Sequence, residues 1–155
     1  MDASQLIDRL SKAIGRKEDF FSTKPVPTIS QRLNNPGCLP HWKDPSGTPY
    51  PEVNGFVEFP ECQNSGCSHP DHPAEQGWRA LRAQCKINVL KRDLTFLQFF
   101  AGKPGLYKGF CPKDDNSGFS LRKNDPAAYA REVLVAVAGP GSPLTINSAI
   151  SVMLD

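Results

Sequence analysis

A glutamate near the end of a helical segment is the first candidate for chemistry in this sequence. Apolar residues recur at helical spacing from Leu6 to Ile14, and Glu18 follows four residues later. A carboxyl at the C-terminal end of a helix, beside Phe20 or Phe21, is expected to have a raised pKa, because the helix carbonyls and burial both disfavour its charge. Such a group holds a proton near neutral pH and can act as a general acid. The alternative is a solvated glutamate in a charged helix end.

A polar turn follows this helix after a proline-containing loop. The sequence Asn34-Asn35-Pro36-Gly37 predicts a turn, and such a motif by itself is more often structural. Placed after an acidic helix end, it would direct Asn35 and backbone amides at a sugar. The nearby Cys38 and His41 also suggest a thiol nucleophile with its base. No third group that would orient the imidazole is evident, so we disfavour that interpretation.

Four potential metal ligands lie within eleven residues further along the chain. They are Cys62, Cys67, His69 and His72. Two thiolates and two imidazoles suit a tetrahedral zinc ion in a structural role, because four protein ligands leave no open position for catalysis. A polar loop without metal and a disulfide between the two cysteines, formed after release from the cell, remain the alternatives.

The elements that must position these side chains are mainly helical by their sequence patterns. We expect a first helix capped by Ser4 and a second from about 75 to 89 with Trp78 in the core. A third helix is predicted from Thr95 to Gly102, and a fourth between Asp125-Pro126 and Gly139-Pro140. A short last helix is expected near 146–154. Residues 53–59 predict one small β-element, either a single strand or a hairpin that turns at Asn54-Gly55. Cys85 is expected to be a buried thiol.

Length and charge narrow the function classes. A chain of 155 residues with a formal net charge of +2 predicts one domain and gives no electrostatic case for nucleic acid. No apolar run reaches the length of a membrane span, and no secretory signal begins the chain, so we expect no membrane insertion and no export by a signal peptide.

Several of these motifs occur together in one known family. The sequence carries Glu18, Arg32 to Leu39, Gly55-Phe56-Val57-Glu58-Phe59, Gly77-Trp78-Arg79-Ala80-Leu81 and Asn124-Asp125-Pro126-Ala127-Ala128-Tyr129. In order and in most spacings it resembles the small lysozyme-like lytic transglycosylases of bacteriophages and prophages, some of which are virion-associated. Two positions depart from the family pattern: Asp19 stands where glycine is frequent, and Cys38 where asparagine is frequent.

The resemblance implies a single lysozyme-like domain over residues 1–155, with a small β-element beside the active-site cleft and a Cys/His-rich insertion at about 60–75. It implies cleavage of the MurNAc-GlcNAc β-1,4 bond of peptidoglycan by Glu18, with no cofactor required for catalysis. The possible structural zinc ion follows from the Cys/His residues of the insertion and not from the resemblance. Asn35, Arg32, Tyr129 and Phe56 would bind the substrate. The protein would be made in the host cytoplasm, join other virion proteins and act on glycan strands of the cell wall. A hydrolytic muramidase, a non-catalytic virion protein of the same fold and a zinc-stabilised interaction module are the alternatives.

Overall fold

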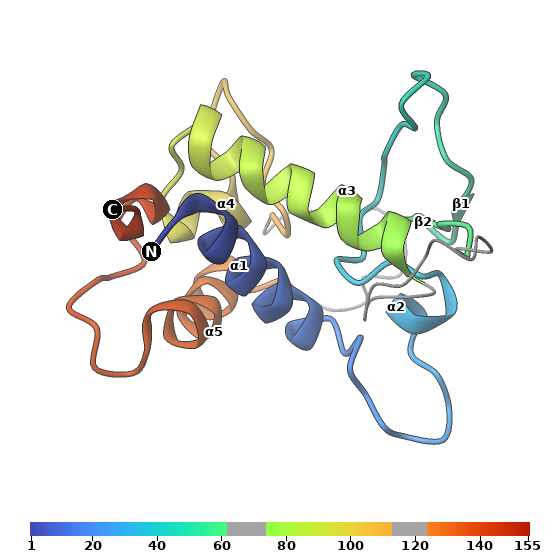
Figure 1. The fold of residues 1–155 in the computed structure, drawn as a ribbon, viewed down its shortest axis with the longest axis horizontal. Helices are drawn as coiled ribbons and strands as arrows, with labels where there is room; N and C mark the ends of the chain where they lie inside the picture. Colours follow the sequence, from blue (N-terminus) through green and yellow to red (C-terminus); the bar gives the residue numbers. More distant parts are fainter. Residues whose placement is uncertain (62–73, 113–123) are drawn as a thin grey trace. The chain divides into compact units, whose positions relative to one another are not determined.

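The computed structural model describes residues 1–61, 74–112 and 124–155 (Figure 1). Within these ranges the chain is mainly helical with one two-stranded antiparallel sheet, which confirms the predicted class at this level. The helices are α1 (Ala3–Lys17), α2 (Ile29–Arg32), α3 (Glu75–Lys86), the π-helical turn η1 (Ile87–Lys91), α4 (Phe96–Ala101), α5 (Pro126–Ala138) and the 3₁₀ turn η2 (Ile150–Met153), and the strands are β1 (Glu52–Val53) and β2 (Phe56–Val57). No helix in the described ranges combines the length and the apolar character that crossing a membrane requires.

The backbone divides into two compact units. Unit 1 consists of Met1–Ala13 and Gln84–Asp155, and unit 2 consists of Ile14–Ala83. The boundaries fall inside α1 and α3, so each of these helices contributes residues to both units.

In unit 1, α4 packs against α5 around an aromatic core (Figure 1). The Thr95 hydroxyl accepts a hydrogen bond from the backbone of Gln98 and caps α4, while Asp125 caps α5 in the same way. Gly102 and Gly139 end the two helices at φ values of 96° and 91°, where glycine is favoured. The predicted start and end signals of both helices are therefore confirmed.

Other predicted details of unit 1 need correction. The cap of α1 is Asp2, whose carboxylate accepts from the backbone of Gln5 at 2.8 Å, and not Ser4, which already lies inside the helix. The helix predicted from 75 to 89 changes from α to π geometry at Ile87. The last predicted helix is the single turn η2.

In unit 2, the small β-element is a hairpin. Glu52 pairs with Val57, and Val53 pairs with Phe56. The two turn residues, Asn54-Gly55, both have positive φ, as a two-residue hairpin turn requires. The hairpin alternative is thus the one that the structure adopts.

The part of α3 that belongs to unit 2 packs very closely against its neighbours. Two glycines allow this: Gly77 within α3, and Gly15, which faces Trp78. A Cβ atom at Gly77 would lie 2.0 Å from the carbonyl oxygen of Asn34, so α3 rests directly on the turn backbone. A Cβ atom at Gly15 would lie 2.7 Å from the ring of Trp78, which is 1% exposed. The Gly-Trp pair therefore contacts both the Asn-Asn-Pro-Gly turn and the end of α1, which is the helix that precedes Glu18.

Candidate active site at Glu18

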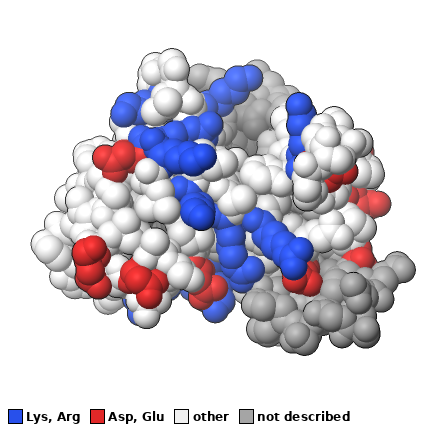
Figure 2. Space-filling model, turned by 45° about the horizontal axis from the view of Figure 1, so that its top comes forward, with Lys and Arg blue, Asp and Glu red and all other residues white. Residues whose placement is uncertain are grey.

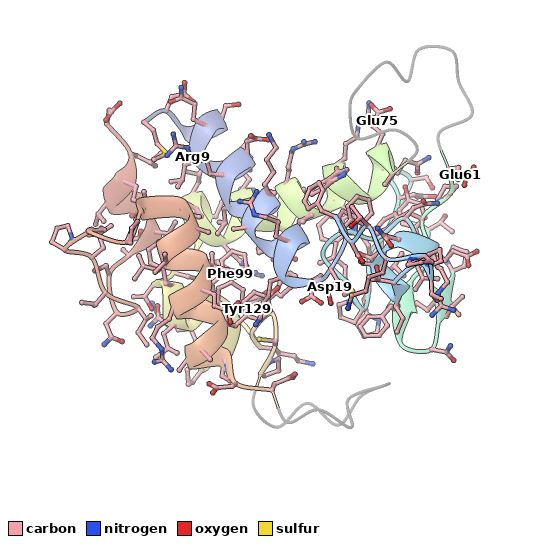
Figure 3. The ribbon with its side chains drawn as sticks, turned by 90° about the horizontal axis from the view of Figure 1, so that it is seen from below. Arg9, Asp19, Glu61, Glu75, Phe99 and Tyr129 are labelled. Carbon is pink, nitrogen blue, oxygen red and sulfur yellow. The ribbon has the colours of Figure 1, made fainter. Side chains whose placement is uncertain are left out.

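The end of α1 has the hydrogen bonds of a Schellman motif. The Phe20 N–H donates to the carbonyl of Gly15 at 2.9 Å, and the Asp19 N–H donates to that of Arg16 at 3.1 Å. Asp19 has φ of 57°, and Figure 3 shows it at the end of α1. Glycine is usual at this position of the motif, because a side chain is strained there. Glu18, the residue just before it, is half-buried and held by the helix termination.

Side chains of α2 and its cap bind the carbonyl groups of the three residues that follow α1. Ser30 Oγ donates to the Glu18 carbonyl at 2.8 Å, Thr28 Oγ1 to that of Asp19 at 3.0 Å, and Gln31 Nε2 to that of Phe20 at 2.9 Å. The sequence reasoning missed these residues. The Thr-x-x-Gln spacing of a capping box was the available signal for α2, but it does not reveal that α2 packs on Glu18.

Cys38 lies within reach of the charge of Glu18. Burial raises the pKa of Cys38 well above its usual range, and the negative charges of Glu18 and, to a smaller degree, Asp19 raise the pKa further. A raised pKa disfavours the thiolate form that a nucleophilic cysteine needs.

His41, the base in the thiol-nucleophile hypothesis, has a different partner. His41 is exposed, and its Nδ1 lies 3.0 Å from Glu52 Oε1. The imidazole is thus oriented by a carboxylate on β1.

Asn35 holds the loop together and is itself fully buried. Its Nδ2 donates to the carbonyls of Leu39 and Val57 at 3.0 and 2.9 Å, and its Oδ1 accepts from the Leu39 N–H at 2.9 Å. We expected this side chain to point at a substrate, but the structure directs it at the backbone. Asn35 thereby joins the turn to β2 and fixes the residues on either side of Cys38.

The remaining unit 2 residues that we predicted for substrate binding lie on separate elements. Arg32 is exposed on α2, and Phe56 is half-buried on β2. The sequence reasoning did not single out Phe21 as a ligand surface, although it is 50% exposed and its ring lies 5.7 Å from that of Trp78. An exposed aromatic ring three residues from Glu18 is a suitable surface for the apolar face of a sugar.

Tyr129 belongs to unit 1, unlike Glu18. It is buried on α5, and its ring stacks on that of Phe100 with centroids 4.3 Å apart. Figure 3 shows it beside Phe99 in the same aromatic cluster. The structure therefore gives Tyr129 a place in the core of unit 1.

The metal prediction falls outside the part of the chain that the structure describes. Cys62, Cys67, His69 and His72 all lie in residues 62–73, so zinc binding stays a prediction. In residues 1–61, 74–112 and 124–155, no three His, Cys, Asp or Glu side chains are grouped to hold a metal ion. Basic and acidic side chains both occur on the face in Figure 2, as the small net charge leads one to expect.

Taken together, these contacts hold the backbone of Glu18 at the end of α1, and the charge of Glu18 acts on the Cys38 thiol. A carboxyl group in such a setting can donate and accept a proton. No known family model, curated protein or solved structure matches this chain.

Proposed function

We propose that this protein is a lytic transglycosylase of lysozyme-like fold that cleaves the MurNAc-GlcNAc β-1,4 bond of peptidoglycan, with Glu18 as its general acid and base. Protonated Glu18 gives its proton to the glycosidic oxygen as the bond to C1 breaks. The resulting carboxylate then takes the proton of the muramic C6 hydroxyl, whose oxygen closes on C1. This route needs one carboxyl group and produces a 1,6-anhydro end.

The fixed position of Glu18 carries this proposal. A general acid must hold its geometry towards the scissile bond, because small displacements cost large factors in rate. The backbone of Glu18 is held by the termination of α1 and by the Ser30 hydroxyl, and its charge acts on the nearby Cys38 thiol.

A hydrolytic muramidase is the second candidate, because Asp19 provides a neighbouring carboxylate. The charges of Glu18 and Asp19 both act on the Cys38 thiol. Hydrolysis requires a second carboxyl group about 5–9.5 Å from the acid, and it leaves reducing ends instead of anhydro ends. The product therefore distinguishes the two mechanisms.

The test is mass spectrometry of fragments released from purified peptidoglycan. The wild-type protein is expected to release 1,6-anhydromuramic ends, and Glu18→Gln to lose activity by roughly 10²–10⁴-fold, because the amide cannot donate an acidic proton. Glu58→Gln, which changes an exposed glutamate of the same unit, serves as the control and is expected to retain full activity.

Other outcomes would change the assignment. Reducing ends that disappear in Asp19→Asn would replace the transglycosylase with a muramidase. No release by a folded wild-type protein would refute the enzyme and favour a structural role in the virion.

A further inference from the structure

The ring of Phe21 is half exposed, yet other side chains hold it in place. Its centroid lies 5.6 Å from that of Phe20, which meets it edge-on, and 5.7 Å from that of Trp78, whose plane is inclined to it by 35°. Gly15 of α1 leaves room for both rings, because a Cβ atom there would lie 2.7 Å from Trp78 and 3.4 Å from Phe21 Cε2. The Phe21 ring therefore rests on protein on one side and remains 50% exposed to solvent.

One side chain of α2 holds the main chain on both sides of Phe21. Gln31 Nε2 donates to the carbonyl of Phe20 at 2.9 Å and to that of Ser22 at 2.8 Å. Gln31 Oε1 accepts from the Thr28 N–H at 2.9 Å, so the amide that makes these two bonds is itself fixed. A contact surface that is ordered before a ligand arrives lowers the entropic cost of binding. Phe21 has this property in both its main chain and its ring.

The exposed apolar area at Phe21 suits a small ligand and not a protein surface. A phenylalanine side chain offers about 150–250 Å², so half exposure leaves roughly 100 Å². A stable protein partner covers about 800 Å² on each side. The other exposed large apolar side chains in the described part of unit 2 are Val26 and Val53, and even together the three residues fall far short of that area. One ring of a ligand is enough to cover Phe21.

We propose that Phe21 is a sugar-binding residue of the Glu18 site, on which one N-acetylhexosamine unit of a β-1,4-linked glycan stacks. The ring substituents of such a unit are mostly equatorial, so its C–H groups form an apolar face, and the electron-rich face of an aromatic ring attracts them. The choice of a glycan rests on the proposed function. Phe21 lies in the turn that directly follows Glu18, in which the Ser22 N–H donates to the Asp19 carbonyl at 3.2 Å.

The test is isothermal titration calorimetry with the β-1,4-linked hexamer of N-acetylglucosamine. The titrated protein carries Glu18→Gln, so that the probe is not cleaved. Phe21→Ala in this protein is expected to raise Kd about tenfold, because the stacking surface is lost. Phe21→Leu keeps an apolar side chain without a ring face and should also bind more weakly, whereas Phe21→Trp should bind at least as tightly. Val26→Ala, a change at an apolar residue that is 78% exposed, is the matched control and should leave Kd unchanged.

Three results would overturn the proposal, provided that thermal unfolding shows each protein to be folded. The first is no binding of the hexamer at millimolar concentration. The second is a Phe21→Ala variant with the same Kd as the Val26→Ala control. The third is a Phe21→Trp variant that binds as weakly as Phe21→Ala, because an aromatic ring at this position would then make no difference.

Kinetics on soluble glycan strands separate the sugar contact from the chemistry at Glu18. Phe21→Ala alone is expected to raise KM about tenfold with little change in kcat, because binding and not proton transfer is lost. Wild-type kinetics in this variant would overturn the sugar contact and leave the proposed function of Glu18 intact. Weaker hexamer binding by Phe21→Ala, combined with a wild-type protein that releases nothing from peptidoglycan, would instead refute the enzymatic function and leave the sugar contact intact.

Discussion

Gly77 provides a sharp test of how unit 2 is assembled. Replacement by alanine adds one methyl group to the first turns of α3. That carbon would lie 2.0 Å from the Asn34 carbonyl oxygen and 2.8 Å from Pro36 Cδ. The first of these neighbours is backbone and the second is a proline ring, so neither can rotate away from the added atom.

Two opposing effects decide the magnitude. Alanine in place of glycine favours a helix by about 1 kcal/mol. Overpacking in a close-packed region costs about 1–3 kcal/mol, and an overlap with the main chain belongs at the upper end of that range or beyond it. We therefore expect Gly77→Ala to lower the free energy of unfolding by about 2 kcal/mol, or Tm by about 4–8 °C for a chain of this size.

The assay is thermal and urea unfolding of the full chain followed by circular dichroism. Gly141→Ala is the matched control, because a Cβ atom there meets nothing within 4 Å, and its Tm should stay within about 2 °C of wild type. The same overlap moves the turn that carries Cys38, so Gly77→Ala should also lose activity at temperatures where it is still folded. A variant as stable as wild type, or more stable, would show that α3 does not rest on this turn.

Two further predictions concern the unusual backbone at residue 19 and the burial of a tyrosine. Asp19→Gly removes a side chain from a position with positive φ, so it should raise the free energy of unfolding by about 0.5–1 kcal/mol in urea titrations. A loss of stability would mean that the Asp19 side chain makes a stabilising contact. Burial raises the pKa of Tyr107 to about 12, although the positive charge of Arg92 acts to lower it. The unfolded chain then loses this proton first, so stability should fall as the pH rises from about 10 to about 12. Tyr107→Phe should flatten that part of the stability profile, and an unchanged slope would contradict the burial.

Local signals in the sequence predicted most of the local structure. Thr95 and Asp125-Pro126 mark helix starts, and Gly102 and Gly139 mark helix ends, because capping depends on residues within one turn of each other. The Asn54-Gly55 hairpin follows for the same reason, since its two positive φ angles are a property of those two residues. Trp78 and Cys85 are buried as their helical spacing predicts.

The details of the candidate site depend on contacts between segments that are distant in sequence. The turn motif predicted that Asn35 binds a substrate. Its buried amide instead makes three hydrogen bonds to backbone groups, one of them 22 residues away. The charge of Glu18 acts on Cys38, which lies twenty positions further along the chain, and the Ser30 hydroxyl binds the Glu18 carbonyl. A periodic pattern records which face of an element is apolar, but it does not record which other element lies against that face.

The local sequence therefore determines that a carboxyl group lies at a helix end. The residues around that carboxyl group are brought there by tertiary packing. Residue types and spacing determine the helix, its cap and the turn, because those structures are stabilised by neighbours in the chain. The hydroxyl that binds the Glu18 carbonyl and the glycine that lets α3 approach the turn have these roles only in the folded chain, because each needs an atom from another segment within about 3 Å.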